Sequence, residues 1–132
     1  MPNAAPAAST RDVSGAWNFT THVESSAVEA FSGLQLGYTI QLTQSGDRVH
    51  GTGRKMTENG TAIGSQAQTP ITMDGTIKGD RLTLTFTETG TQRESQGKFV
   101  LLADEGTLRG RFSSTAAQSS GTVEAHRAAG AR

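Results

Sequence analysis

Apolar and polar residues alternate along most of the chain, and helical periodicity is almost absent. Alternation with a period of two is typical of strands that have one buried and one exposed face. Runs rich in Thr, Val, Ile and aromatic residues are separated by Gly, Asp, Asn and Ser, as in strands joined by turns. The pattern predicts an all-β protein with eight strands, at about residues 15–25, 34–44, 48–57, 69–78, 81–88, 92–102, 107–114 and 120–127.

The predicted connections are alternately tight and, for the most part, longer. Ser45–Asp47, Gly79–Asp80 and Ala103–Gly106 are rich in Gly and Asp, which accept a positive φ at low cost in tight hairpins. The connections between them include the longer segments Ser25–Gly33 and Glu58–Gln68. In an up-and-down meander, alternate turns lie at the same end, and closure of the sheet removes its two exposed edges. We therefore expect a closed eight-stranded antiparallel up-and-down barrel with one tight-turn end and one open end.

Alternation also assigns an inward face to each strand. The clearest stripe runs from Leu34 to Leu42, whereas four consecutive apolar residues in the sixth run leave its register ambiguous; there we choose Phe99 and Leu101 as inward. Several glycines fall at inward positions halfway along the barrel. We interpret them as space left for a ligand, with relief of strand coiling as the alternative. These glycines are Gly51, Gly53, Gly75, Gly97 and Gly110.

The predicted interior changes from apolar at the tight-turn end to polar near the open end. Eight strands enclose room either for their own side chains or for one small ligand. We expect one small, largely apolar organic molecule to bind there. Its predicted contacts are Leu36, Tyr38, Ile40, Met73, Leu84, Phe86, Glu88, Phe99 and Phe112.

Two of these residues also carry candidate chemistry. Glu88 is predicted to face inward near the open end, and Tyr38 to face it from mid-height. A carboxylate can act as a general acid or base, and a phenol can donate a hydrogen bond to a carbonyl. If the protein is an enzyme, Glu88 and Tyr38 would be its catalytic residues, in a cofactor-free cyclase or isomerase whose cavity orients the substrate. The alternative is that Glu88 pairs with Lys55 or Arg93 in a solvated rim.

Composition excludes several function classes. Lys+Arg and Asp+Glu are equal at 12 each, so no net charge attracts nucleic acid or an anionic membrane surface. Cys is absent, which excludes disulfides, thiolate metal sites and a cysteine nucleophile. No apolar run is long enough to span a bilayer. Because His22, His50 and His126 fall on outward positions of different strands, we expect no metal and no cofactor. The sequence does not determine whether the protein forms an oligomer.

Two short features of the chain resemble a known superfamily. Gly15-Ala16-Trp17 opens the first predicted strand, and Arg127 closes the last. They resemble the G-x-W motif and terminal arginine of the calycins, which include lipocalins, fatty-acid-binding proteins and avidins. The resemblance implies that Trp17 plugs the closed end with Arg127 packed across its indole. Because the single Trp is assigned to that plug, an avidin-type biotin site is not expected.

The resemblance further implies that a small molecule enters at the open end. The loop at 25–33 would form a lid that places Val28 and Phe31 over the mouth; alternatively, it is a surface loop that folds these residues back onto the rim. Lipocalin-like barrels also occur among natural-product cyclases. Some calycin-like bacterial inhibitors insert an N-terminal arm into a protease cleft, for which Ala7–Thr10 is small and extended enough. The third predicted function is therefore a protein-binding module.

The two ends of the chain differ from its middle. Residues 1–12 are rich in Ala and Pro and lack the basic and apolar segments of a signal peptide, so we expect a disordered arm. Residues 13–128 would form the single barrel domain, and residues 129–132 a frayed tail. We expect a cytoplasmic protein, or a secreted one if a leader has been removed.

Overall fold

The computed structural model describes residues 11–27, 32–64, 68–90, 94–104, 106–115 and 118–128. All eight predicted strands are present, each with ends within two residues of the prediction. A two-residue strand in the long connection at 58–68 was not predicted. The strands are β1 (Gly15–Ser25), β2 (Gln35–Ser45), β3 (Arg48–Glu58), β4 (Thr61–Ala62), β5 (Pro70–Lys78), β6 (Arg81–Thr89), β7 (Glu94–Asp104), β8 (Thr107–Ser114) and β9 (Ser119–Arg127).

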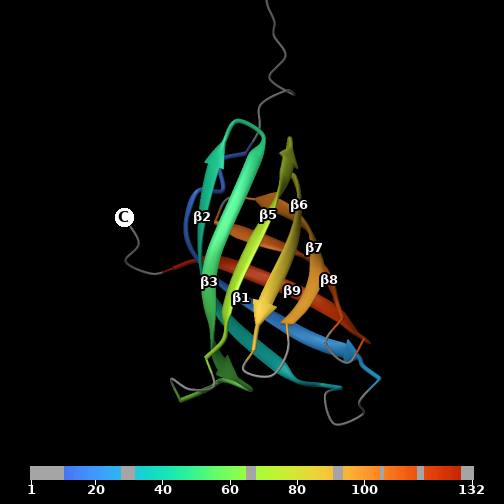
Figure 1. Ribbon diagram of the computed structural model, residues 1–132. Helices are drawn as coiled ribbons and strands as arrows, with labels where there is room; N and C mark the ends of the chain where they lie inside the picture. The colour runs from blue at the N-terminus through green and yellow to red at the C-terminus, as the bar shows by residue number, and fades with distance from the viewer. Residues whose placement is uncertain are drawn as a thin grey trace, which may run out of the picture.

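The sheet closes on itself. The long strands pair antiparallel with their neighbours in sequence, and β1 pairs with both β2 and β9. The short β4 forms a hairpin with β3 and takes no part in the ring. In Figure 1, β2, β3 and β5 run steeply across the front, and β1, β8 and β9 cross behind them. The predicted closed eight-stranded antiparallel up-and-down barrel is therefore confirmed.

The register chosen for the sixth predicted strand is also confirmed. On β7, Phe99 and Leu101 are buried, whereas Val100 is 45% and Leu102 is 53% exposed. Phe99 stacks on Phe86 with ring centroids 4.7 Å apart. These inward side chains belong to one continuous apolar core that extends from the tight-turn end to the open end, where it includes Tyr38, Phe86 and Phe112.

Backbone hydrogen bonds link the tight turns at the closed end. The N–H of Ile77 donates to the carbonyl of Asp47, and the N–H of Ala103 donates to that of Asp80. The chain before β1 crosses this end: the N–H of Arg11 donates to the carbonyl of Gly79, and Val13 is only 1% exposed. Residue 11, which we expected to belong to the arm, is therefore held against the barrel, while residues 1–10 and 129–132 lie outside the described part.

The interpretation of the mid-height glycines as space for a ligand is wrong. A Cβ built on Gly110 would lie 1.9 Å from the carbonyl oxygen of Val100, and one on Gly75 would lie 1.8 Å from that of Thr83. Real Cβ atoms essentially never approach closer than 3.0 Å. These glycines let neighbouring strands approach and bend around the barrel. The others in the group, Gly51, Gly53 and Gly97, have contacts of 2.0–2.6 Å.

Candidate functional site

A pocket of about 60 Å³ lies inside the barrel at the open end. It has aromatic and aliphatic walls with hydroxyl and carboxylate groups among them. The volume is room for about four water molecules at roughly 15 Å³ each, and so for a compact group. The described lining residues are Thr21, Val23, Leu36, Tyr38, Phe86, Glu88, Phe99, Phe112, Ser114 and Ser119.

Six of the nine predicted ligand contacts line this pocket, and three do not. Leu36, Tyr38, Phe86, Glu88, Phe99 and Phe112 are brought together as expected. Ile40, Met73 and Leu84 are only 3%, 1% and 0% exposed and lie in the packed core. Side chains from facing strands pack against these three residues, which therefore do not contact the described pocket. The predicted lid residues, Val28 and Phe31, lie outside the described residues, as does Arg93.

A polar network surrounds the Glu88 carboxylate at the wall of the pocket. The Tyr38 hydroxyl on β2 donates to Oε1 of Glu88 on β6, with 3.0 Å between the oxygens. The Thr69 hydroxyl, just before β5, donates to Oε2 in a short hydrogen bond. Lys55 Nζ on β3 lies 3.4 Å from the same Oε2. We considered two arrangements for Glu88, a contact with Tyr38 and an ion pair with Lys55. Both occur together in one network.

The network is sheltered from solvent. The Glu88 side chain is 14% exposed and that of Lys55 is 21% exposed, so water screens their attraction less than on an open surface. The Lys55–Glu88 pair therefore differs from the solvated rim pair that we considered as an alternative. Because three groups from different segments of the chain contact the carboxylate, its position in the lumen is fixed.

Burial is the main cause of an altered pKa at Tyr38. Desolvation raises the pKa of the phenol well above its ordinary value of 10.0, and the negative charge of Glu88 and the hydrogen bond to it raise the pKa further. The Tyr38 hydroxyl therefore keeps its proton at neutral pH and acts as a hydrogen-bond donor. Together with a fixed carboxylate, it can anchor a polar group or hold a proton in place.

Trp17 and Arg127 meet at the closed end. The Arg127 guanidinium lies over the indole, with Cζ 4.6 Å from the ring centroid. Its Nη1 and Nη2 donate to the carbonyls of Ser14 and Asp12 at 2.8 and 2.9 Å. The Trp17 indole N–H donates to the carbonyl of Val13 at 2.8 Å. The arginine thus ties the segment before β1 to the last residue of β9.

Some contributors to the site were missed in the sequence. Thr69 lies two residues before the inward Ile71, so the alternation already placed it on the inner face. Ser119 lies on the same face as Gly121, but the strand was predicted to begin one residue later. Thr69 already lay within the predicted strand at 69–78, whereas Ser119 required the pattern to be extended one residue past a predicted strand end.

The described residues contain no group of three or more His, Asp or Glu side chains that could hold a metal ion. The described part of the chain also contains no helix with the length and apolar character needed to cross a membrane. No protein-family model matches the sequence, and a search of curated proteins finds no match. The site is therefore interpreted from its own geometry.

Proposed function

We propose that the barrel binds one small, largely apolar organic molecule at its open end. The observation that carries this proposal is the fixed Tyr38–Glu88 pair at the wall of a pocket lined mainly by apolar side chains. Ligand sites typically combine apolar walls with a few well-placed polar groups. In this proposal the apolar part of the ligand contacts Phe86 and Phe112, and Glu88 anchors its polar part.

The sheltered network supports this role because it is costly for stability alone. Removing a carboxylate and an ammonium from water is unfavourable, and an apolar replacement is often neutral or stabilising. Polar groups that interrupt an otherwise apolar barrel interior are expected at functional sites. Glu88 and Lys55 occupy such positions, where they pair in the sheet with the core residues Ile71 and Tyr38.

The accepting capacity of Glu88 indicates which polar group the ligand carries. A carboxylate offers about four acceptor positions. Within the described chain, Tyr38, Thr69 and Lys55 contact this one, which leaves about one position for a ligand. A hydroxyl or amine N–H donor fits that position. Given the small pocket, a compact molecule or the polar end of a longer one enters it, and any remainder extends through the mouth.

We also propose that the chain is related to the calycins. The closed barrel, the Gly15–Trp17 opening of β1 and the contact of Arg127 with the Trp17 indole support this relationship. In calycins the opposite end of the barrel is where ligands enter, which agrees with a site at Glu88.

Blocking the pocket tests the proposal. Ser114 lines the pocket, whereas its neighbour Ser113 is exposed on the outer face of β8. We expect Ser114→Phe to abolish saturable binding of 1-hexanol, measured by isothermal titration calorimetry, and Ser113→Phe to leave it unchanged. Equal binding of 1-hexanol by both variants at unchanged stability would show that the alcohol binds elsewhere and would refute the proposed site.

The contact between Tyr38 and Glu88 favours a second candidate function. A phenol and a carboxylate 3.0 Å apart could relay a proton in a cofactor-free cyclase or isomerase. Glu88→Gln separates the two functions, because it retains the shape of the side chain and removes the base. A binding protein should show only a modest change in affinity, whereas an enzyme should lose about 100-fold or more in turnover while remaining folded.

A further inference from the structure

A groove of about 370 Å³ lies on the outer wall of the barrel, apart from the open-end pocket. It spans β2, β3 and β5 toward the tight-turn end. Most of its lining side chains are polar, and they point outward from the strands. The lining residues are Thr43, Ser45, Arg48, Val49, His50, Asp74, Gly75 and Thr76.

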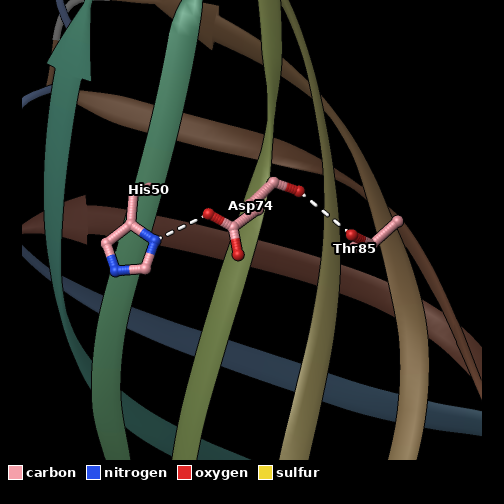
Figure 2. A network of polar contacts seen from close by, with 3 residues as sticks. All are labelled: His50, Asp74 and Thr85. Carbon is pink, nitrogen blue, oxygen red and sulfur yellow. Dashed lines mark hydrogen bonds and ion pairs between the residues drawn. The ribbon is translucent and has the colours of Figure 1, made fainter.

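One wall of the groove is a paired histidine and aspartate. His50 Nδ1 lies 2.7 Å from Asp74 Oδ1, across the pairing of β3 with β5. Figure 2 shows the other ring nitrogen of His50 pointing away from Asp74. The Thr85 hydroxyl donates to the backbone carbonyl of Asp74 at 3.1 Å and does not contact its carboxylate. Asp74 thus orients the imidazole, and the second ring nitrogen stays exposed.

Arg48 lies beside this pair with hydroxyl groups on both sides. Its partners in the sheet are Ser45 on β2 and Thr76 on β5. Arg48 and His50 point outward from one strand two residues apart, which places their Cα atoms about 7 Å from each other. Within the described residues Arg48 forms no ion pair, in contrast to Arg109 and Arg111 on β8. Its guanidinium is therefore available to a ligand.

Hydrogen-bond donors dominate the lining. The guanidinium offers five N–H groups, and the hydroxyls of Thr43, Ser45 and Thr76 offer one each. Asp74 is the only carboxylate among the lining residues, and one of its oxygens already contacts His50. A lining of this kind complements a ligand rich in acceptor oxygens.

We propose that this groove binds an oxyanion, the phosphate or carboxylate group of a small molecule, with Arg48 as its principal ligand. The planar guanidinium donates two parallel hydrogen bonds to two oxygens of such a group. Ser45 and Thr76 lie where they can donate to the same oxygens from either side. His50 and Asp74 form the side wall of the site, and the Asp74 carboxylate opposes the anion. The site is independent of the open-end pocket.

The test uses inorganic phosphate and acetate as probes, with binding followed by NMR at the backbone amides of Arg48, His50 and Thr76. Wild-type protein is expected to show saturable shifts at these amides. Arg48→Gln should weaken binding about tenfold or more, the size expected for a lost charge-assisted contact. Arg48→Lys keeps the positive charge but not the two parallel N–H donors, so it should weaken binding less than Arg48→Gln does.

Two further variants test the assignment of charge. Arg54→Gln removes the same charge from the same face of β3 outside the groove, and it should leave affinity unchanged. Asp74→Asn removes the opposing charge at about 7 Å from the anion and should tighten binding about two- to threefold in water.

Each result of the phosphate and acetate titrations either supports or overturns the proposed oxyanion site. Saturation with both probes supports a general oxyanion site, and saturation with phosphate alone narrows it to phosphate. Absence of saturable shifts with either probe, or equal weakening by Arg48→Gln and Arg54→Gln, would overturn the proposal.

Discussion

Gly110→Ala distinguishes most sharply between an open lumen and tightly coiled strands. If the mid-height glycines left space inside the barrel, an added methyl group would be tolerated there. In the structure, a Cβ at residue 110 would lie 1.9 Å from the carbonyl oxygen of Val100, 2.9 Å from its carbonyl carbon and 3.0 Å from Cα of Leu101. These atoms are backbone, so rotation of a side chain cannot relieve the contact.

The magnitude follows from the displacement that is required. The strand β7 must move by about 1 Å to restore a normal contact, which stretches its pairing with β8 at Leu101 and Gly110. Overpacking costs about 1–3 kcal/mol, and each weakened ladder hydrogen bond adds about 1 kcal/mol. The reduced entropy of the unfolded chain returns about 0.4–1 kcal/mol. We expect Gly110→Ala to lower the free energy of unfolding by about 3 kcal/mol.

Gly64→Ala is the matched control. A Cβ added at Gly64 would have no atom within 4 Å, and Gly64 has no left-handed φ. The free energy of unfolding of Gly64→Ala should therefore stay within about 0.5 kcal/mol of the wild-type value. Urea unfolding can be followed by the fluorescence of the single tryptophan, Trp17, with the slope m compared between variants. Equal stability of Gly110→Ala and Gly64→Ala would refute the argument from strand coiling.

Two further predictions concern Tyr38 and Arg127. Burial raises the pKa of Tyr38 in the folded state, so the neutral phenol contributes to the stability of the fold. This contribution is fully present below pH 10.0 and is lost as the pH rises through the folded-state pKa. The chain has one tyrosine, so tyrosinate absorbance should appear only together with unfolding above pH 10.0; ionisation near pH 10.0 in a folded protein would contradict this. Arg127→Ala removes two hydrogen bonds and the contact with Trp17 and should cost about 1–3 kcal/mol in urea unfolding. The exposed Arg109, paired with Glu124 at 3.5 Å, provides the control, and Arg109→Ala should cost about 0–1 kcal/mol. Equal losses for the two arginines would contradict the role given to Arg127.

The fold was largely predictable because its signals are local. Alternation located all eight long strands, and turn residues at Gly46, Gly79 and Gly106, which adopt positive φ, separated tight connections from long ones. The same alternation placed Tyr38 and Glu88 on inward faces at neighbouring heights, where their side chains now meet.

What could not be predicted depends on distances between strands. The two-residue period shows that Gly110 faces inward, but it does not show how closely Val100 approaches it on the next strand. For the same reason, the sequence placed Met73 at a ligand wall although facing side chains fill that level of the lumen. The outer groove also escaped prediction, because it required the register that brings His50 opposite Asp74.

The central claim, that a small apolar molecule binds at the open end, is tested most directly by NMR mapping with 1-hexanol, whose hydroxyl can donate to Glu88. We predict saturable shifts at pocket residues such as Leu36, Phe86 and Ser114, with the closed-end Leu82 and Leu108 unaffected. The shifts should disappear in Ser114→Phe and persist in Ser113→Phe. Saturable shifts confined to the outer wall, or none at any pocket residue, would contradict the account.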